Sequence, residues 1–310
     1  MVLNIVIPCY NEEAVLPETN RQLSGLIGEW ISGGLLEDCR IVYVDDGSKD
    51  RTWEIIESLQ KESPYAHGLK LAHNVGHQHA LWAGLMHSVG KCDAAVSIDA
   101  DLQHDIRAIK EMIDAFKDGC EVVYGVRNDR GTDSGFKKKT ALGFYRLMGK
   151  MGVDLIPNHA DFRLLGSKAL EALSQYPERN LFLRGMVRSL GFKERIVHFE
   201  CHERFAGESK YTLRKMVNFA IDGITSFSVQ PLRMIAVLGF VVLILSFFAG
   251  LYALVAYFCG KTIQGWTSIL LSIWFLGGIQ LLCIGVLGEY IGKNYVEVKR
   301  RPRFIIEKEV

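Results

Sequence analysis

Two aspartates separated by one residue, Asp99 and Asp101, form the most informative chemical feature of the sequence. They follow the short apolar run 94–98, which predicts a buried strand of a parallel sheet. Side chains at positions i and i+2 share a face of an extended chain, so both carboxylates would point into the crevice at the carboxyl end of the strand. Hard oxygen ligands placed this way suit Mg²⁺ or Mn²⁺, which usually takes further ligands from substrate phosphates. The alternative is that these acids only cap the next helix.

Strands and helices alternate along the first half of the chain. Short apolar runs predict strands at residues 3–8, 40–44, 69–73, 94–98 and 121–126. Apolar residues at helical spacing predict helices around 15–26 and at 52–62, 78–87 and 106–116. We expect Asn11 to cap the first helix and Ser48 or Asp50 to cap the second. The alternation predicts an α/β fold with a mostly parallel, doubly wound sheet.

Polar turns follow four of the predicted strands. Their sequences are P-C-Y-N-E-E at 8–13, D-D-G-S at 45–48, N-V-G at 74–76 and D-A-D-L-Q at 99–103. Loops after strands are often polar, which accounts for any one of these turns. Loop polarity alone accounts poorly for four such turns, two of which contain a pair of acidic residues. The set therefore indicates that ligands bind at this edge of the sheet.

Composition limits the classes of partner. The formal net charge of +1 balances 36 basic against 35 acidic residues, so no overall field favours nucleic acid as a partner. The seven cysteines are scattered and form no C-x-x-C pair, which argues against structural disulfides and a zinc site. This cysteine usage fits a reducing, cytosolic compartment for the catalytic part. The chain opens on a strand pattern rather than a signal sequence.

Two stretches without a charged residue, 234–259 and 264–288, lie in the C-terminal third. Each is longer than the roughly 20 apolar residues that cross a bilayer, so they predict a transmembrane hairpin. The alternative is a very apolar, buried helix pair in a soluble domain. Basic residues flank both ends of the hairpin, which places both ends in the cytoplasm; they are Arg214, Lys215, Arg233, Lys293, Lys299, Arg300, Arg301 and Arg303. Residues 211–228 predict an amphipathic helix on the membrane surface, and 137–150 predict a basic helix near lipid head groups.

Cationic side chains recur in the second half, where they suit phosphate. Arg127 ends the fifth strand and is a candidate phosphate contact, with a solvated loop arginine as the alternative. The loop 204–211 places Arg204, Ser209 and Lys210 around Gly207, as an anion-binding loop would. The alternative for this loop is a tether to anionic lipid.

The four turns and two later segments, D-F-R-L at 161–164 and R-x-x-G-x-S-K-Y at 204–211, resemble the family 2 glycosyltransferases. The resemblance implies the GT-A fold, which is a Rossmann-like sheet. D-A-D-L-Q narrows it to the polyprenyl-phosphate branch, which includes dolichol-phosphate mannose synthases and bacterial undecaprenyl-phosphate glycosyltransferases. The similarity runs over essentially the whole chain.

The resemblance also implies a role for individual residues. It implies that the nucleotide-sugar donor is bound by Pro8, Tyr10, Glu12, Val44, Asp45, Asp46, Asp99, Ala100, Arg127 and Ser209. It implies that Mg²⁺ or Mn²⁺ is held by Asp99, Asp101 and Gln103, and that the catalytic residues are Asp101, Asp161, Arg204 and Lys210. For Asp161 the alternative is a buried acid paired with Arg163. His77 and His79 depart from the pattern and are expected to be solvated, and His104 has no assigned role.

These expectations describe an inverting, metal-dependent enzyme that moves a sugar from a nucleoside diphosphate to a polyprenyl phosphate. It would be a multi-pass protein of the inner (plasma) membrane with a cytoplasmic catalytic domain, and it is open to self-association as a homo-oligomer. The expected organisation is a catalytic domain at 1–210, an interfacial helix at 211–230, a hairpin at 231–291 and a basic tail at 292–310. The alternatives are a polysaccharide synthase, a glycolipid synthase, and a non-catalytic nucleotide-binding scaffold.

Overall fold

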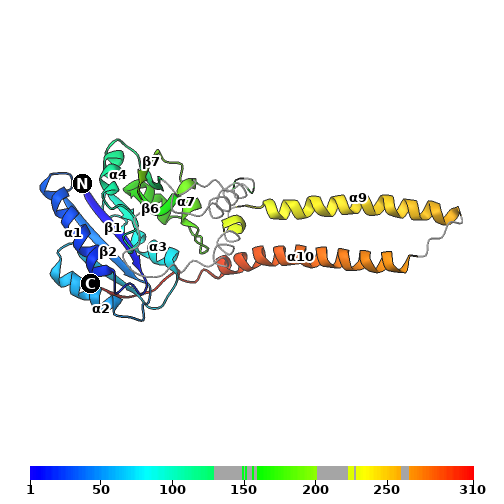
Figure 1. Cartoon of the computed structure of the whole chain (residues 1–310), viewed down its shortest axis with the longest axis horizontal. Helices are drawn as coiled ribbons and strands as arrows, with labels where there is room; N and C mark the ends of the chain where they lie inside the picture. The colour runs from blue at the N-terminus through cyan, green and yellow to red at the C-terminus, as the bar shows by residue number, and fades with distance from the viewer. Residues whose placement is uncertain are drawn as a thin grey trace.

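A computed structural model describes residues 1–128, 149, 151, 156, 159–200, 223–226, 228–259 and 265–310 of the chain. Most of the predicted basic helix at 137–150 and most of the predicted interfacial helix at 211–228 lie outside these residues. The structure comprises an α/β domain and two long helices that extend from it in the same direction (Figure 1).

The α/β domain is built on one mixed sheet with the strand order β7-β5-β6-β4-β1-β2-β3-β8. In chain order its strands are β1 (Val2–Cys9), β2 (Asp38–Asp45), β3 (Ala66–Leu71), β4 (Ala94–Ser97), β5 (Val122–Arg127), β6 (His159–Gly166), β7 (Glu194–Phe199) and β8 (Ile306–Glu309). The β1–β2, β1–β4, β2–β3 and β5–β7 pairs are parallel. Strand β6 runs antiparallel to both β4 and β5, and β8 runs antiparallel to β3.

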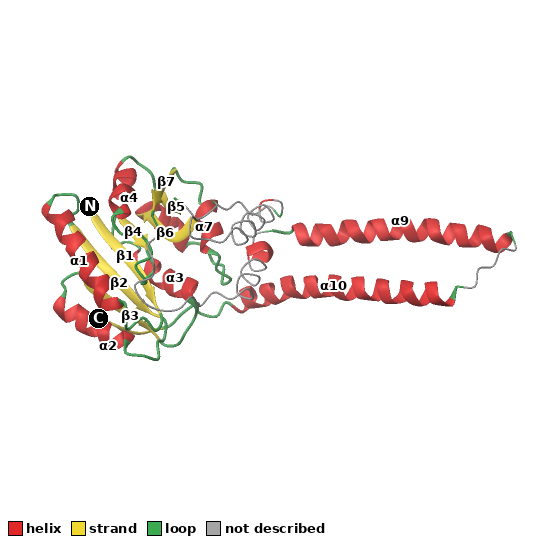
Figure 2. Cartoon of the chain, viewed as in Figure 1, coloured by secondary structure: helices red, strands yellow, loops and turns green. Residues whose placement is uncertain are grey.

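Helices cover both faces of this sheet (Figure 2). The described helices are α1 (Leu16–Ser32), α2 (Thr52–Glu62), α3 (His77–Ser88), α4 (Ala108–Lys117), α6 (Ser167–Ser174), α7 (Leu183–Ser189), α9 (Gln230–Phe258) and α10 (Trp266–Lys299). One buried cluster joins α1, α2 and α4 to the sheet, and a second joins α3, α6 and α7 to it. The predicted doubly wound α/β fold is confirmed.

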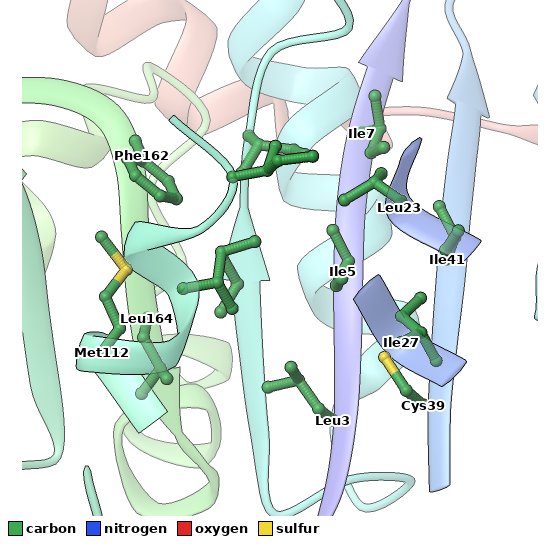
Figure 3. Close-up of a cluster of buried hydrophobic side chains, with 14 of the residues drawn as sticks. Leu3, Ile5, Ile7, Leu23, Ile27, Cys39, Ile41, Met112, Phe162 and Leu164 are labelled. Carbon is green, nitrogen blue, oxygen red and sulfur yellow. The ribbon is translucent and has the colours of Figure 1, made fainter. Parts of the chain in front are cut away.

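Alternation along β1 decides which side chains enter which layer. Leu3, Ile5 and Ile7 are fully buried in the cluster that α1 and α4 cover, as Figure 3 shows. Val6 points to the other face and is packed beneath α3. Burying each such side chain contributes about 1.5–3 kcal/mol. Because β1 is apolar on both sides, it occupies the centre of the sheet.

The order of strands places a crevice at the carboxyl end of β1. From β1 the chain builds β2 and β3 on one side, while β4 pairs with the other side. The loops that leave β1 and β4 therefore diverge, and such a switch point is where open α/β sheets bind ligands. The turns at 9–13 and 99–103 both start at this point.

Close packing fixes α3 over the centre of the sheet. A Cβ atom added at Gly84 would lie 2.3 Å from Val6 Cγ1 and 2.9 Å from Val44 Cγ2, so glycine lets the helix approach β1 and β2 closely. The start of α3 is thereby held at the carboxyl edge of these strands.

Several local predictions were wrong. Asn11 does not cap α1, because its backbone has φ 55° and its Oδ1 accepts the N–H of Lys49 at 2.9 Å. Helix α1 begins at Leu16, with no side-chain cap. Asp50 does accept the N–H of Thr52, the first residue of α2, at 3.0 Å. The third strand spans Ala66–Leu71 rather than 69–73.

The two C-terminal helices contain 29 and 34 residues, which corresponds to about 44 and 51 Å. By length and composition both can cross a membrane, over Gln230–Tyr252 and Ser272–Lys299. None of the residues in these apolar windows is buried, so large side chains such as Phe240, Leu243 and Trp274 lie exposed. This surface requires an apolar environment, since exposed apolar area costs about 25 cal/mol per Å² in water.

The C-terminal segment does not behave as the separate tail expected at 292–310. Helix α10 continues to Lys299, and β8 then adds to the edge of β3. Gly68 and Val310 exchange two backbone hydrogen bonds of 2.8 and 2.9 Å. The chain therefore returns from α10 to the sheet, which ties the helix pair to the α/β domain (Figure 1).

Candidate active site

The turn after β4 holds the aspartate pair. Leu102 has φ 55°, which closes the turn, and the Gln103 N–H donates to Asp101 Oδ1 at 3.2 Å. The buried Ala100 carbonyl accepts a hydrogen bond of 2.8 Å from Thr19 Oγ1 on α1. The turn is thus anchored from beneath, while Asp99 and Asp101 remain partly exposed.

Two imidazoles lie near the Asp99 carboxylate, one at each oxygen. Nε2 of His77 lies 3.7 Å from Oδ1, and Nε2 of His104 lies 3.7 Å from Oδ2. His104 is 2% exposed and stacks on Phe162 with ring centroids 5.1 Å apart. Burial lowers the pKa of His104, so its ring is neutral at pH 7.

Asp161 on β6 is the centre of the charge network. Its carboxylate pairs with Arg163 and accepts bonds of 3.2 and 3.3 Å from Nε and Nη2 of Arg184 on α7. Its Oδ2 lies 3.6 Å from Nε2 of His77. Burial alone would raise the pKa of Asp161, but the charge of Arg184 and the contacts with His77 and Arg163 lower it well below its usual value. Asp161 is therefore an anion at neutral pH.

His77 is the cation that links Asp161 to the turn after β4. Its side chain is 45% exposed, so desolvation opposes the charged form only in part, and the contact with Asp161 and the charge of Asp99 raise the pKa to about 9. The imidazolium thus stands at the start of α3, between the ends of β4 and β6. A cation beside a partly exposed carboxylate pair is suited to holding a substrate phosphate.

His77 is exposed at the start of α3, as the sequence predicts, but it also contacts two of the predicted site residues, which the sequence did not indicate. The signal that identifies it is its position directly after the N-V-G turn, at the same sheet edge as Asp99. Both interpretations of Asp161 apply at once, since it pairs with Arg163 and also contacts His77. Arg184 was missed altogether, because nothing local in the sequence marks it.

The start of α7 is fixed to the start of α3. The Leu183 N–H donates to Gln78 Oε1 at 3.0 Å. This bond lies beside Arg184 and His77 in the chain, so the two helical cations among the three partners of Asp161 come from helices that contact each other.

The turns after β2 and β3 form one structure. Asp46 accepts the N–H groups of Val75 and Gly76 at 2.7 and 3.0 Å, one on each carboxylate oxygen. Burial raises the pKa values of both Asp45 and Asp46. A Cβ atom at Gly47 would lie 2.6 Å from the backbone N of Asn74, so this close approach requires glycine. Asp46 thus shapes the loop that leads into His77.

The turn after β1 packs on the turn after β2. The N–H of Glu12 donates to Thr52 Oγ1 at 2.9 Å, and the N–H of Asn11 donates to Ser48 Oγ at 3.0 Å. Pro8 is buried, whereas Tyr10 is partly exposed. The structure therefore brings three of the four motif turns into contact, along the edge that the aspartate pair continues.

The remaining predicted residues divide into two groups. Val44 is buried beneath this edge, and the half-buried Arg127 ends β5. Arg204, Ser209 and Lys210 lie outside the described residues.

The donor set after β4 fits a divalent cation that binds together with a diphosphate. Asp99, Asp101 and Gln103 supply carboxylate and carboxamide oxygens, and Mg²⁺ needs only one or two protein carboxylates when phosphates provide further ligands. Within the described ranges, no three His, Cys, Asp or Glu side chains are placed to hold a metal ion by themselves.

Comparison with known proteins places these features in a family. A family model described as Glycosyl transferase family 2 matches residues 4–174. A Bacillus subtilis protein named uncharacterized glycosyltransferase YkoT is 53% identical over 99% of this chain and 91% of its own. An Escherichia coli protein named prophage bactoprenol glucosyl transferase homolog is 40% identical over 99% of both chains. Among solved structures, glucosyl-3-phosphoglycerate synthase from Mycobacterium tuberculosis is a distant likeness, with 18% identity and a TM-score of 0.47 over 72% of this chain and 76% of that one.

Neutralising Asp161 should destabilise the α/β domain. Asp161→Asn leaves the Arg163 guanidinium, 1% exposed, beside Arg184 with less compensating charge, and breaking such a buried pair costs about 3–5 kcal/mol. The matched control is Asp118→Asn, because Asp118 forms an exposed 2.7 Å pair with Arg195 that is worth less than about 1 kcal/mol. Thermal unfolding in neutral detergent should show a much lower midpoint for the first variant. Equal midpoints for the two variants would contradict the buried network.

Proposed function

The chain belongs to glycosyl transferase family 2, and from this premise we propose that it transfers a sugar from a nucleoside diphosphate to a polyprenyl phosphate. The Escherichia coli relative, which aligns over nearly its whole length, is named for glucosyl transfer with bactoprenol, a polyprenol. The proposal rests mainly on the presence of a polar sheet edge and an apolar helix pair in the same chain. An edge of carboxylates and cations suited to a diphosphate lies in a domain that is tied to two exposed apolar helices.

In this reaction the donor would lie along the edge formed by the turns after β1, β2 and β4. Pro8, Tyr10 and Glu12 would contact the base and ribose together with Asp45 and Asp46. The diphosphate would lie at Asp99 and Asp101, which agrees with the position of this pair at the switch point.

A divalent cation held by Asp99, Asp101 and Gln103 would supply charge neutralisation on the departing diphosphate. The chain's own residues supply the rest of the charge balance. The His77 imidazolium lies 3.7 Å from the Asp99 carboxylate and would provide an N–H donor for a phosphate oxygen. Asp161 keeps this imidazole charged and oriented, and is a positioning residue in the present structure.

The acceptor phosphate is an anion at neutral pH, so it can attack the anomeric carbon without a strong general base. A single in-line displacement would invert the configuration at that carbon. Arg204 and Lys210 are proposed to offset the charge of the two phosphates that meet in the reaction, and Ser209 is proposed to donate its hydroxyl hydrogen to the donor phosphate. A polysaccharide or glycolipid synthase gains no support from the described residues.

The exposed surfaces of α9 and α10 support a membrane location for the helix pair. The start of α9 and the end of α10 both lie next to the α/β domain (Figure 1). A helix pair that crosses the membrane would therefore leave the domain on one side of the bilayer. The basic residues at 293–303 favour the cytoplasmic side of the inner membrane. Self-association of the chain stays a prediction.

Transfer should be measurable directly and should require a divalent cation. Membranes or purified full-length protein, incubated with radiolabelled nucleotide sugars and undecaprenyl phosphate, should yield one labelled lipid. EDTA should abolish its formation and Mg²⁺ or Mn²⁺ should restore it.

Asp101→Asn should lower turnover by orders of magnitude, since it removes a ligand charge at the diphosphate. Asp105→Asn is the control, because it removes the same charge four residues later in the chain. The metal assignment would be overturned by full turnover of Asp101→Asn in chelator, and the function by the absence of labelled lipid with every donor.

Topology can be read from a cysteine that the chain already contains. Cys259 is exposed at the end of α9, on the side far from the α/β domain. An impermeant maleimide added to intact spheroplasts should label the parent protein but not Cys259→Ser. The same reagent added to inverted vesicles should leave Cys259 unlabelled. Labelling of Cys259 from the cytoplasmic side alone would exclude a transmembrane hairpin.

A further inference from the structure

A second cationic site lies where α10 meets the α/β domain. A cavity of about 560 Å³ opens between the last turns of α10, the loop that contains Arg179 and Asn180, and the segment that follows α10. Its positively charged lining residues are Arg179, Lys293, Lys299, Arg301 and Arg303. Of the described residues that line it, Glu289 alone is acidic. The cavity therefore has a net positive charge and suits an anion.

Hydrogen bonds hold the walls of this cavity together. The Glu297 carboxylate accepts the N–H of Arg179 at 2.8 Å and that of Asn180 at 2.7 Å. Because Glu297 is engaged by the backbone, its charge joins α10 to the loop instead of lining the cavity. Lys293 donates to Ser226 Oγ at 3.1 Å from the same side of α10. The cavity is thus formed by the attachment of α10 to the domain.

Two guanidinium groups in the wall retain unused donors. The Nε–H groups of Arg179 and Arg303 are buried and have no acceptor within the part of the chain that the structure describes. Arg303 lies over the Trp82 ring at 4.3 Å and donates to the Tyr176 carbonyl, so its position is fixed. Buried donors of this kind are satisfied in native proteins by protein, water or a ligand.

The neighbourhood of the cavity indicates a ligand with an apolar part. Gly288 and Gly292 line it from α10, and a Cβ added at either would meet nothing within 4 Å. The apolar residues of α10 lead directly into it, since Gly288 ends the uncharged stretch of the sequence. A bound anion would therefore stand at the level of lipid head groups if α10 crosses a membrane.

The cavity is also close to the candidate active site but distinct from it. His79 lines the cavity and contacts the Arg179 carbonyl through Nε2 at 3.2 Å. His77, two residues earlier in the first turn of α3, contacts Asp99 and Asp161. The first turn of α3 therefore separates a cationic cavity at the membrane side from the carboxylate edge.

We propose that this cavity binds the phosphate head group of a lipid, at a site separate from that of the nucleotide sugar. The inference rests on one part of the proposed function, the location of α10 in a membrane, and not on the transfer reaction itself. Two sources of such a phosphate exist, a polyprenyl phosphate that waits beside the active site and a bulk anionic phospholipid that anchors the domain.

Equilibrium binding of radiolabelled undecaprenyl phosphate to the full chain in neutral detergent tests the proposal. Lys293→Gln and Arg301→Gln should each weaken binding about tenfold, as expected for loss of one charge-assisted contact. Arg300→Gln is the matched control, because Arg300 adjoins Arg301 and does not line the cavity. It should leave the affinity within about twofold of the parent value. Arg301 is exposed, so its replacement should not impair folding.

Three competitors identify the ligand. Undecaprenol without phosphate should not displace the probe, and neither should inorganic phosphate at the same concentration. Displacement by phosphatidylglycerol would assign the cavity to lipid phosphates in general, and its failure would assign it to the polyprenyl phosphate; both results support the proposal. Parent affinity in both cavity variants, or equal displacement by undecaprenol or inorganic phosphate, would overturn it. Loss of sugar transfer with lipid binding intact would contradict the proposed function alone.

Discussion

A carboxylate that is largely removed from solvent needs positive partners, and the partners of Asp161, which is 18% exposed, connect the elements that form the candidate site. Asp161 meets Arg163 on its own strand, Arg184 on α7 and His77 on α3. Leaving such a charge uncompensated would cost several kcal/mol. The three cations therefore hold β6, α7 and α3 together, and His77 carries the link on to Asp99 at the end of β4. The geometry of the edge follows from this one charge balance.

A carboxylate also attaches the helix pair to the α/β domain. Glu297 near the end of α10 binds two backbone N–H groups of the domain, and β8 then closes on β3. These contacts are far apart in sequence but adjacent in the fold. They place the cationic cavity beside His79, two residues after His77, which contacts Asp99, so the two proposed phosphate sites share the start of α3.

Local patterns were enough to predict strands β1 to β5 and four of the polar turns at their carboxyl ends. A strand such as β1 is apolar over its whole length, and the acids after β4 follow directly from the sequence. Strands β6, β7 and β8 were not predicted, because each is stabilised by pairing with strands distant in the chain. His77 and Arg184 were missed for the same reason, since Asp161, which gives them their role, lies far along the sequence. Asn11 was predicted to cap a helix because its residue type favours that position. In the structure it instead forms hydrogen bonds between the turn after β1 and the turn after β2.

The account depends most on His77 and Asp99 acting as one unit in sugar transfer. A double-mutant cycle on the rate of transfer to undecaprenyl phosphate, with His77→Gln, Asp99→Asn and the double variant, measures this directly. The 3.7 Å contact predicts that the double variant is little slower than the slower single variant, with a coupling energy of at least about 1 kcal/mol. Effects that add to within about 0.5 kcal/mol would show that the two residues act independently, and would contradict the account.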